Sequence, residues 1–256
     1  MNERNLPLAG QNVLVTGASK GIGAATARAF AEAGADVAVH YRFDRAGADA
    51  VVADVTKLGR RAIAIAADLG RWDEGERLVE AAEKDLGPVD HVVVNHGIWK
   101  EAAIDAMTSA LYEEMMDANL RGAFSVAGAA VRRMKPRRRG HLVFVASTAG
   151  QRGEAHHAHY AASKGALISL TKSLSTELAA HGLRANCVAP GWVLTPMSQS
   201  SLDDPEERAK VLATIPVGRV GTVEQIAAPI VFLCTEGAGF VTGEIFNVNG
   251  GAVLVG

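Results

Sequence analysis

Tyr160 and Lys164, four positions apart in the segment Tyr-Ala-Ala-Ser-Lys, are the residues of this sequence best suited to moving a proton. In a helix this spacing places both side chains on one face, one turn apart. A nearby ammonium favours the phenolate and so lowers the pKa of a tyrosine, which is ordinarily about 10. The same pair is also a common surface pattern, so it predicts an acid/base only if other residues join it.

Ser147 and Asn119 are two further candidates. Ser147 ends the apolar run 142–146, which puts a hydroxyl at the carboxyl end of a predicted strand, where open α/β sheets bind ligands. The Gly-x-Ser-x-Gly elbow of α/β hydrolases is missing around it, which argues against a hydrolase nucleophile. Asn119 is a mediocre helix former within a helical pattern; it could hold a water by interrupting the backbone hydrogen bonds, or simply be tolerated.

A glycine-rich turn follows the first apolar run, with the sequence Thr-Gly-Ala-Ser-Lys-Gly-Ile-Gly over residues 16–23. Gly17 suits a tight turn, Gly21 allows backbone N–H groups to approach a pyrophosphate, and Gly23 allows close packing of the helix that follows. The spacing differs from the commoner Gly-x-Gly-x-x-Gly, so taken alone it also fits any glycine-rich strand–helix turn.

The end of the second apolar run suggests which dinucleotide would bind. NAD enzymes usually present a carboxylate there to the ribose 2′-hydroxyl, whereas this chain has Arg42. Arg42 and Lys20 could pair with a 2′-phosphate, which predicts NADP(H) rather than NAD(H). The alternative is that Arg42 is a solvated loop residue.

The elements that must position these residues alternate along the chain. Continuously apolar runs suit parallel strands covered by helices on both faces, so we expect an α/β fold, a Rossmann-like doubly wound sheet. The chain has no linker-like segment, which predicts one domain over residues 1–256. The expected strands are 12–16, 36–40, 62–66, 91–94, 141–145, 183–189 and 244–248, and the expected helices are 24–33, 46–58, 76–84, 112–134 and 161–180.

The least regular part of the chain is 191–221. Within it, Asp-Asp-Pro-Glu-Glu at 203–207 has the pattern of a helix start. We expect a substrate lid around 192–216; an ordinary surface helix fits the same pattern.

Composition narrows the class of protein. The 256 residues are 48% hydrophobic with a formal net charge of −2, so no overall basic field points to nucleic acid. No apolar run is long enough to span a bilayer and residues 1–5 lack the plan of a signal peptide, so we expect a cytoplasmic protein away from membranes. Cys187 and Cys234 lie in apolar stretches and are predicted to be buried free thiols.

Together, these residues resemble the short-chain dehydrogenase/reductase family over essentially the whole chain. The cofactor loop 16–23 matches, Asn119, Ser147, Tyr160 and Lys164 match the catalytic tetrad in order, and Pro190, Gly191 and Thr195 match the nicotinamide segment. The resemblance implies a seven-stranded domain in which Tyr160 is the acid/base, Ser147 orients the substrate carbonyl, Lys164 binds the nicotinamide ribose and lowers the tyrosine pKa, and Asn119 anchors a proton-relay water. It also implies adenine contact by Asp68, carboxamide contact by Thr195, and cofactor contacts by Gly17, Ser19, Lys20, Gly21, Ile22, Gly23, Tyr41, Arg42, Leu69, Asn95, Gly97, Tyr160, Lys164, Pro190, Gly191 and Val193.

Histidines mark the departures from the family pattern. His96 replaces a small residue between Asn95 and Gly97, which affects local packing but removes no catalytic group. His156, His157 and His159 precede Tyr160 in the family's substrate loop. With no acid or cysteine to complete a ligand set, we expect them to line the substrate mouth or hydrogen-bond locally, and we predict no metal site.

Within the family the pattern looks most like 3-oxoacyl-[acyl-carrier-protein] reductases. A basic run could receive an acidic acyl carrier or be a solvated helix end that stops at Pro136; Thr176, where carrier-using relatives have a second arginine, weighs against the carrier. Sugar, steroid and small-ketone substrates stay open, as does a non-catalytic NADP-binding sensor. The uncharged tail 250–256 and the resemblance predict a homotetramer. The basic run consists of Arg132, Arg133, Lys135, Arg137, Arg138 and Arg139.

Overall fold

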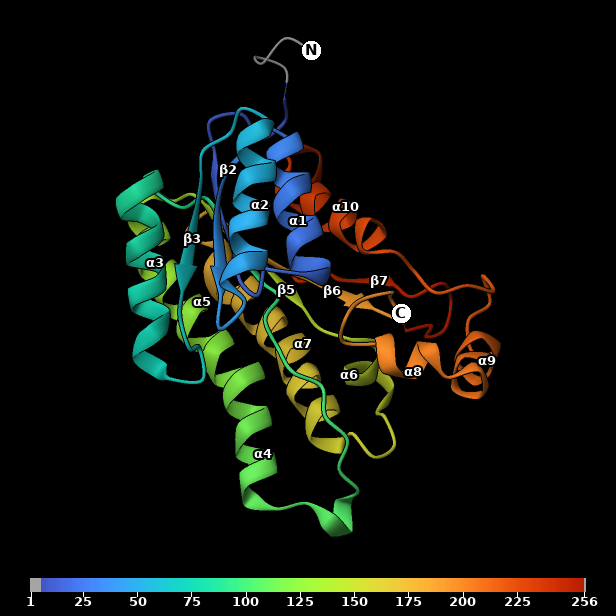
Figure 1. Ribbon diagram of the computed structural model, residues 1–256. Helices are drawn as coiled ribbons and strands as arrows, with labels where there is room; N and C mark the ends of the chain where they lie inside the picture. Colours follow the sequence, from blue (N-terminus) through green and yellow to red (C-terminus); the bar gives the residue numbers. More distant parts are fainter. Residues whose placement is uncertain (1–5, 256) are drawn as a thin grey trace.

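The computed structural model describes residues 6–255 as one doubly wound α/β domain (Figure 1). Residues 1–5, on which the signal-peptide expectation rests, lie outside the described residues. All seven strands are parallel, in the order β3-β2-β1-β4-β5-β6-β7. They are β1 (Asn12–Val15), β2 (Asp36–Tyr41), β3 (Ala62–Ala66), β4 (His91–Val94), β5 (Gly140–Val145), β6 (Leu183–Pro190) and β7 (Ile245–Val248).

Two layers of helices cover the sheet and bury its apolar residues on both faces. One core cluster joins the sheet to α1 (Gly21–Glu32), α2 (Arg45–Lys57) and α10 (Val223–Cys234), and the other joins it to α3 (Trp72–Leu86), α5 (Gly122–Arg137) and α7 (Ala158–Ala179). Within β1, Val13 and Val15 belong to the first cluster and Leu14 to the second. Burial on both faces explains why the strands are continuously apolar, and it confirms the predicted fold class.

The order of the strands creates a binding crevice. β1 pairs with β2 on one side and with β4 on the other, so the chain reverses its direction of travel across the sheet at β1. In open α/β sheets the loops at such a switch point part at the carboxyl ends of the strands and leave room for a ligand.

One predicted helix, 112–134, is interrupted. The structure has α4 (Ser109–Met116), then a turn of π-helix η3 (Asp117–Arg121), then α5. Pro136 lies in the last turn of α5, which ends one residue later at Arg137, close to the predicted stop. Arg138 has a φ of 52° there, a left-handed conformation typical of helix ends.

The segment predicted as a lid forms two short helices, α8 (Gln199–Asp203) and α9 (Pro205–Ala213), which extend from the sheet (Figure 1). Asp204 caps α9 by accepting hydrogen bonds from the N–H groups of Glu206 and Glu207 at 2.8 and 3.0 Å. The excursion has a small core of its own: Leu202, Val211 and Ile215, with Trp192 packed against them. Shorter elements are α6 (Thr148–Arg152), η2 (Ile104–Ala106) and η4 (Glu236–Ala238).

Cys187 and Cys234 are buried free thiols, as predicted. Over the described part of the chain, none of the helices combines the length and apolar character needed to cross a bilayer. In the C-terminal tail Val253 is buried whereas Leu254 is 90% exposed, so the expected burial of the tail against a partner subunit stays a prediction.

Candidate active site

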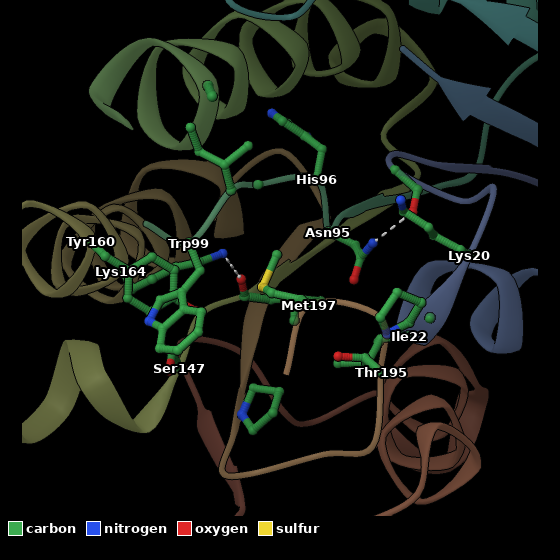
Figure 2. Close-up of a pocket in the computed structure, with 18 of the residues that line it drawn as sticks. Lys20, Ile22, Asn95, His96, Trp99, Ser147, Tyr160, Lys164, Thr195 and Met197 are labelled. Carbon is green, nitrogen blue, oxygen red and sulfur yellow. Dashed lines mark hydrogen bonds between the residues drawn. The ribbon is translucent and has the colours of Figure 1, made fainter. Parts of the chain in front are cut away.

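A cavity of about 460 Å³ opens at the carboxyl ends of the strands. Its lining includes every residue predicted to contact the cofactor except Gly23, together with Ser147, Tyr160 and Lys164. Figure 2 shows Ser147, Tyr160, Lys164 and Trp99 on one side of the cavity and Lys20, Ile22 and Thr195 on the other, with Met197 between them. The structure thus gathers residues from seven separated segments of the sequence.

The glycine-rich turn is built to hold an anion. Gly17 has a φ of +63°, and a side chain at Gly23 would collide with the carbonyl oxygen of Gly17, so Gly23 lies behind the turn and not in the cavity. Asn95 fixes the turn from β4: its Nδ2 donates to the carbonyls of Thr16 and Gly17 at 3.0 and 3.1 Å (Figure 2). Among the described residues no side chain caps α1, so its first N–H groups point toward the cavity without a side-chain partner.

His40, which the sequence analysis did not single out, holds the same turn from β2. Its Nδ1 accepts the N–H of Gly17 at 3.0 Å and its Nε2 donates to the carbonyl of Ala67 at 3.1 Å. These contacts require a neutral ring, and burial lowers the pKa of His40 to about 4. His40 therefore ties the glycine-rich turn to the loop after β3.

Arg42 and Asp68, predicted at the 2′-phosphate and at the adenine, form an ion pair with each other. Nη2 of Arg42 lies 2.9 Å from Oδ2 of Asp68, and the guanidinium also stacks over the ring of Phe43 at 4.6 Å. Both members of the pair line the cavity. A phosphate bound here would compete with Asp68 for the guanidinium.

Tyr160 and Lys164 lie in the first turns of α7, as predicted, and both are buried. Nζ of Lys164 is 5.9 Å from the centre of the Tyr160 ring and donates to the carbonyl of Val145 at 2.9 Å. Ser147 follows the end of β5; its hydroxyl caps α6 by accepting the N–H of Ala149 at 3.1 Å and also hydrogen-bonds to Tyr160.

The pKa of Tyr160 is raised, to about 12, and not lowered as the Tyr–Lys spacing predicted. Burial of the phenol is the main cause; the hydrogen bond from Ser147 opposes it and the charge of Glu154 adds to it. Lys164 does not offset this burial, since its Nζ lies 5.9 Å from the centre of the ring and donates to the carbonyl of Val145. Burial also lowers the pKa of Lys164 itself, to about 8. In this state Tyr160 is a neutral phenol, suited to donating a proton.

Asn119 lies beneath the cavity in the π-helical turn and is fully buried. Its Oδ1 accepts the N–H of Ile98 at 2.8 Å, and its Nδ2 donates to the carbonyl of Ile98 at 3.0 Å and to the hydroxyl of Ser163 at 3.1 Å. The Asn119 side chain thus hydrogen-bonds to both backbone groups of Ile98, as a neighbouring strand would, and holds the loop after β4 in place. Such π-turns occur often at functional sites, and this one interrupts the predicted helix 112–134 at Asn119.

His96 packs against the start of α5 instead of facing the reaction. Its Nδ1 shares a hydrogen bond with Oγ1 of Thr16 at 2.8 Å, and its Nε2 lies where a side chain on Gly122 would be. Burial holds the pKa of His96 well below its usual range. The departure from the family pattern is therefore accommodated by a glycine on the facing helix.

Aromatic residues at the mouth were missed by the sequence analysis. Trp99 and Trp192 both line the cavity, and their rings meet edge to face with centroids 6.1 Å apart. The signal available was position, because each follows directly on a cofactor segment, after Gly97 and after Gly191. The three histidines before Tyr160 are not among the residues that line the cavity. His157 stacks on Trp99, His156 is exposed and His159 is buried.

The basic run lies away from the cavity. Arg138 and Arg139 precede β5 and line a second, smaller hollow at the amino ends of the strands. Acidic residues neutralise much of the run: Arg132 and Arg133 pair with Glu76, Lys135 with Glu177, and Arg137 and Arg139 with Asp90. This geometry gives the run no place at the mouth of the cavity, where an acyl carrier would have to dock.

His91, His141 and Cys234 form a buried group with ligand atoms within 4.8 Å of one another, near that second hollow. Asn186 donates to Nε2 of His141 at 3.0 Å, and its amide orientation is fixed by bonds to Val241 and Glu244. The neutral His141 ring must then carry its proton on Nδ1, so neither ring nitrogen offers a free lone pair to a metal. These contacts favour a core histidine.

The cavity fits a dinucleotide. An uncapped helix N-terminus at the glycine-rich turn suits a pyrophosphate, with Thr195 packed beside Gly21 of that turn. Arg42 lies at the end of β2, where an adenosine ribose would bind, and Lys164 lies on the opposite side of the cavity from Lys20. A doubly wound sheet with these groups at its switch point defines a dinucleotide-binding protein.

Comparison with known proteins identifies the family. The family model described as enoyl-(acyl carrier protein) reductase matches residues 17–253. A 3-oxoacyl-[acyl-carrier-protein] reductase of Synechocystis sp. is 37% identical, covering 96% of this chain and 98% of the relative, and an L-rhamnose 1-dehydrogenase (NAD(P)(+)) of Azotobacter vinelandii is 40% identical, covering 94% and 96%. The crystal structure of a short chain dehydrogenase from Burkholderia cenocepacia in complex with NADP superposes with a TM-score of 0.90 at 33% identity, covering 96% and 99%.

The chain belongs to the short-chain dehydrogenase/reductase family. It is accordingly an oxidoreductase of CH–OH and C=O groups, in a family that binds nicotinamide cofactors.

Proposed function

We propose that this chain is an NADP(H)-dependent oxidoreductase that interconverts a carbonyl compound and a secondary alcohol, with Tyr160 as the acid/base. The observation that carries the proposal is the convergence of Ser147, Tyr160 and Lys164 on the cavity that the glycine-rich turn also lines. The complete set of catalytic side chains supports an enzyme over a non-catalytic NADP-binding sensor.

The roles of the residues follow from their positions. The cofactor, when bound, supplies or accepts the hydride. In the reduction direction the neutral hydroxyl of Tyr160 donates a proton to the carbonyl oxygen, while the hydroxyl of Ser147 orients that oxygen. Lys164 would bind the nicotinamide ribose, and Asn119 holds the loop at Ile98 through its side-chain amide.

Preference for NADP(H) is part of the proposal. Arg42 and Lys20 both line the cavity, and Tyr41, the last residue of β2, is not a carboxylate that would bind the 2′-hydroxyl of NAD(H). An NADP complex exists for the Burkholderia relative, which supports the same choice. A cytoplasmic homotetramer is the expected form of the enzyme; light scattering at several concentrations tests the subunit number.

Substitution of Tyr160 by Phe tests the mechanism. Removal of the acid/base is expected to lower kcat by about 100- to 10,000-fold, with the Kd for NADPH unchanged. The rate is measured by the absorbance of NADPH with a panel of 3-oxoacyl thioesters, small ketones and sugars. Tyr112→Phe, a half-exposed tyrosine on α4, is the matched control. Turnover that persists in Tyr160→Phe would refute the tyrosine mechanism.

A further inference from the structure

The two indoles at the mouth of the cavity bear on the substrate, and an inference drawn from them rests on the proposed function. Trp99 packs against the small cluster that contains Met115, Ala149 and Tyr160, on the same side of the cavity as Ser147, Tyr160 and Lys164 (Figure 2). Trp192 meets it at 85°, with 6.1 Å between ring centroids. We call these two residues the tryptophan corner.

The tryptophan corner is held in place from outside the cavity. His157 stacks on Trp99 with the rings 3° from parallel and 4.5 Å apart, and it donates from Nδ1 to the carbonyl of Ala155 at 3.0 Å. Because His157 covers one face of the indole, Trp99 borders the cavity with its other face or its edge. A ring fixed in this way loses little conformational entropy when a ligand packs on it.

Charged groups complete the mouth. Glu154 lines the cavity, its side chain is 22% exposed, and its Oε1 lies 3.9 Å from Nδ1 of His157. Its charge adds to the raised pKa of Tyr160. Arg152 lines the same cavity. Two opposite charges give a mouth with no net charge but with both acceptors and donors, which suits a neutral ligand with many hydroxyl groups and disfavours an anionic one.

We propose that the substrate is a neutral monosaccharide in its ring form. A sugar ring presents patches of C–H bonds on its faces and hydroxyl groups around its rim. One face packs on the tryptophan corner, where polarised C–H bonds meet the electron-rich indole. Neighbouring rim hydroxyls donate to the two oxygens of Glu154, an arrangement that a carboxylate accepts at both atoms.

The reaction then balances with NADP⁺ as the oxidant. The C–H bond of one ring carbinol breaks with its electron pair leaving as hydride to the nicotinamide. The O–H proton of that carbinol passes to the oxygen of Tyr160 as the phenolic proton of Tyr160 leaves to water. The products are a keto sugar or a lactone, NADPH and a proton. A linear 3-oxoacyl thioester has no hydroxyl groups that could donate to Glu154, so it would gain no hydrogen bond from that carboxylate.

Binding and turnover of monosaccharides test the proposal. We would add neutral pentoses, hexoses and deoxyhexoses to Tyr160→Phe protein saturated with NADP⁺ and follow saturation transfer to the sugar protons by NMR, then measure kcat and KM for wild-type protein. We expect at least one sugar to bind and to be oxidised. Trp99→Leu should raise its Kd and KM by about 3- to 10-fold and Glu154→Gln by about 10-fold, with the Kd for NADP⁺ unchanged.

Matched controls and alternative outcomes separate this inference from the proposed function. Trp72 is a 62% exposed tryptophan at the start of α3 and Glu80 is an exposed glutamate of the same helix, so Trp72→Leu and Glu80→Gln should leave every value unchanged. If no monosaccharide binds, or if 3-oxoacyl thioesters or simple ketones are turned over and sugars are not, the sugar assignment is wrong while the NADP(H)-dependent mechanism stands. Failure of the wild-type protein to bind NADPH or NADP⁺ would instead refute the proposed function.

Discussion

Arg42 shows how one side chain can pair within the protein and still be available to a cofactor. It is held by Asp68 at 2.9 Å, and the two side chains remain 43% and 39% exposed. An exposed ion pair of this kind contributes little to stability, because water screens both charges. The pair is therefore easily exchanged for a 2′-phosphate, which offers more charge and a better match to the guanidinium fork.

Loss of Arg42 should separate the two cofactors. Arg42→Ala is expected to raise the Kd for NADPH by about 10- to 100-fold, since a charge-assisted hydrogen bond contributes about 1.5–3 kcal/mol, and to change the Kd for NADH by less than about threefold. Fluorescence titration measures both constants. Arg132→Ala, at an arginine paired with Glu76 away from the cavity, should change neither. Equal effects on NADPH and NADH would show that Arg42 does not contact a 2′-phosphate.

At the scale of the element, the π-helical turn η3 is what connects α4 and α5 to the loop after β4. Asn119 satisfies both backbone groups of Ile98, and Ile98 in turn precedes Trp99 in the wall of the cavity. One side chain thus sets the position of the substrate side of the site.

Removal of the Asn119 amide should loosen that wall. Asn119→Ala leaves the N–H and C=O of Ile98 buried without these partners, so we expect the free energy of unfolding to fall by about 1–3 kcal/mol and kcat to fall as well. Urea denaturation and steady-state kinetics measure the two effects. Asn247→Ala, at an exposed asparagine of β7, is the comparison. An unchanged kcat with lowered stability would confine Asn119 to a structural role.

The seven strands could be predicted because burial on both faces leaves a local signature in the sequence. Four of the five helix predictions are confirmed, with boundaries shifted by a few residues. The prediction of one helix over 112–134 was wrong, because the interruption depends on hydrogen bonds between Asn119 and the distant residues Ile98 and Ser163. The prediction that the pKa of Tyr160 is lowered was wrong for the same reason. Tyr160 is buried against Met115 and Ala149, and the spacing of Tyr160 and Lys164 does not reveal that burial.

At the scale of the whole molecule, desolvation keeps the rings of four histidines neutral. Burial lowers the pKa of His40 and of His91 to about 4 and holds those of His96 and His141 well below the usual range. In the unfolded chain each would titrate near about 6.5. Between these values the unfolded chain binds more protons than the folded one. The stability contributed by the neutral rings is therefore fully present above about pH 6.5 and is lost as the pH falls toward 4.

Acid sensitivity should follow directly from these histidines. Between pH 6 and pH 4.5 the free energy of unfolding is expected to fall by up to about 1.4 kcal/mol per pH unit for each histidine, as measured by urea denaturation. His91→Asn should reduce that slope by up to one bound proton, while Asn247→Ala, at an exposed residue that does not titrate, should leave it unchanged. A flat profile through this range would show that the rings are protonated in the folded state.

The tryptophan corner also gives the protein an optical signal of its own. Of the three tryptophans in the chain, two border the cavity and the third, Trp72, is exposed on α3. Reduced nicotinamide absorbs light at the wavelengths that indole emits, so a cofactor beside Trp99 and Trp192 quenches their emission by energy transfer. Trp72→Phe would remove the solvent-exposed emitter and leave a protein whose fluorescence reports the redox state of its own cofactor.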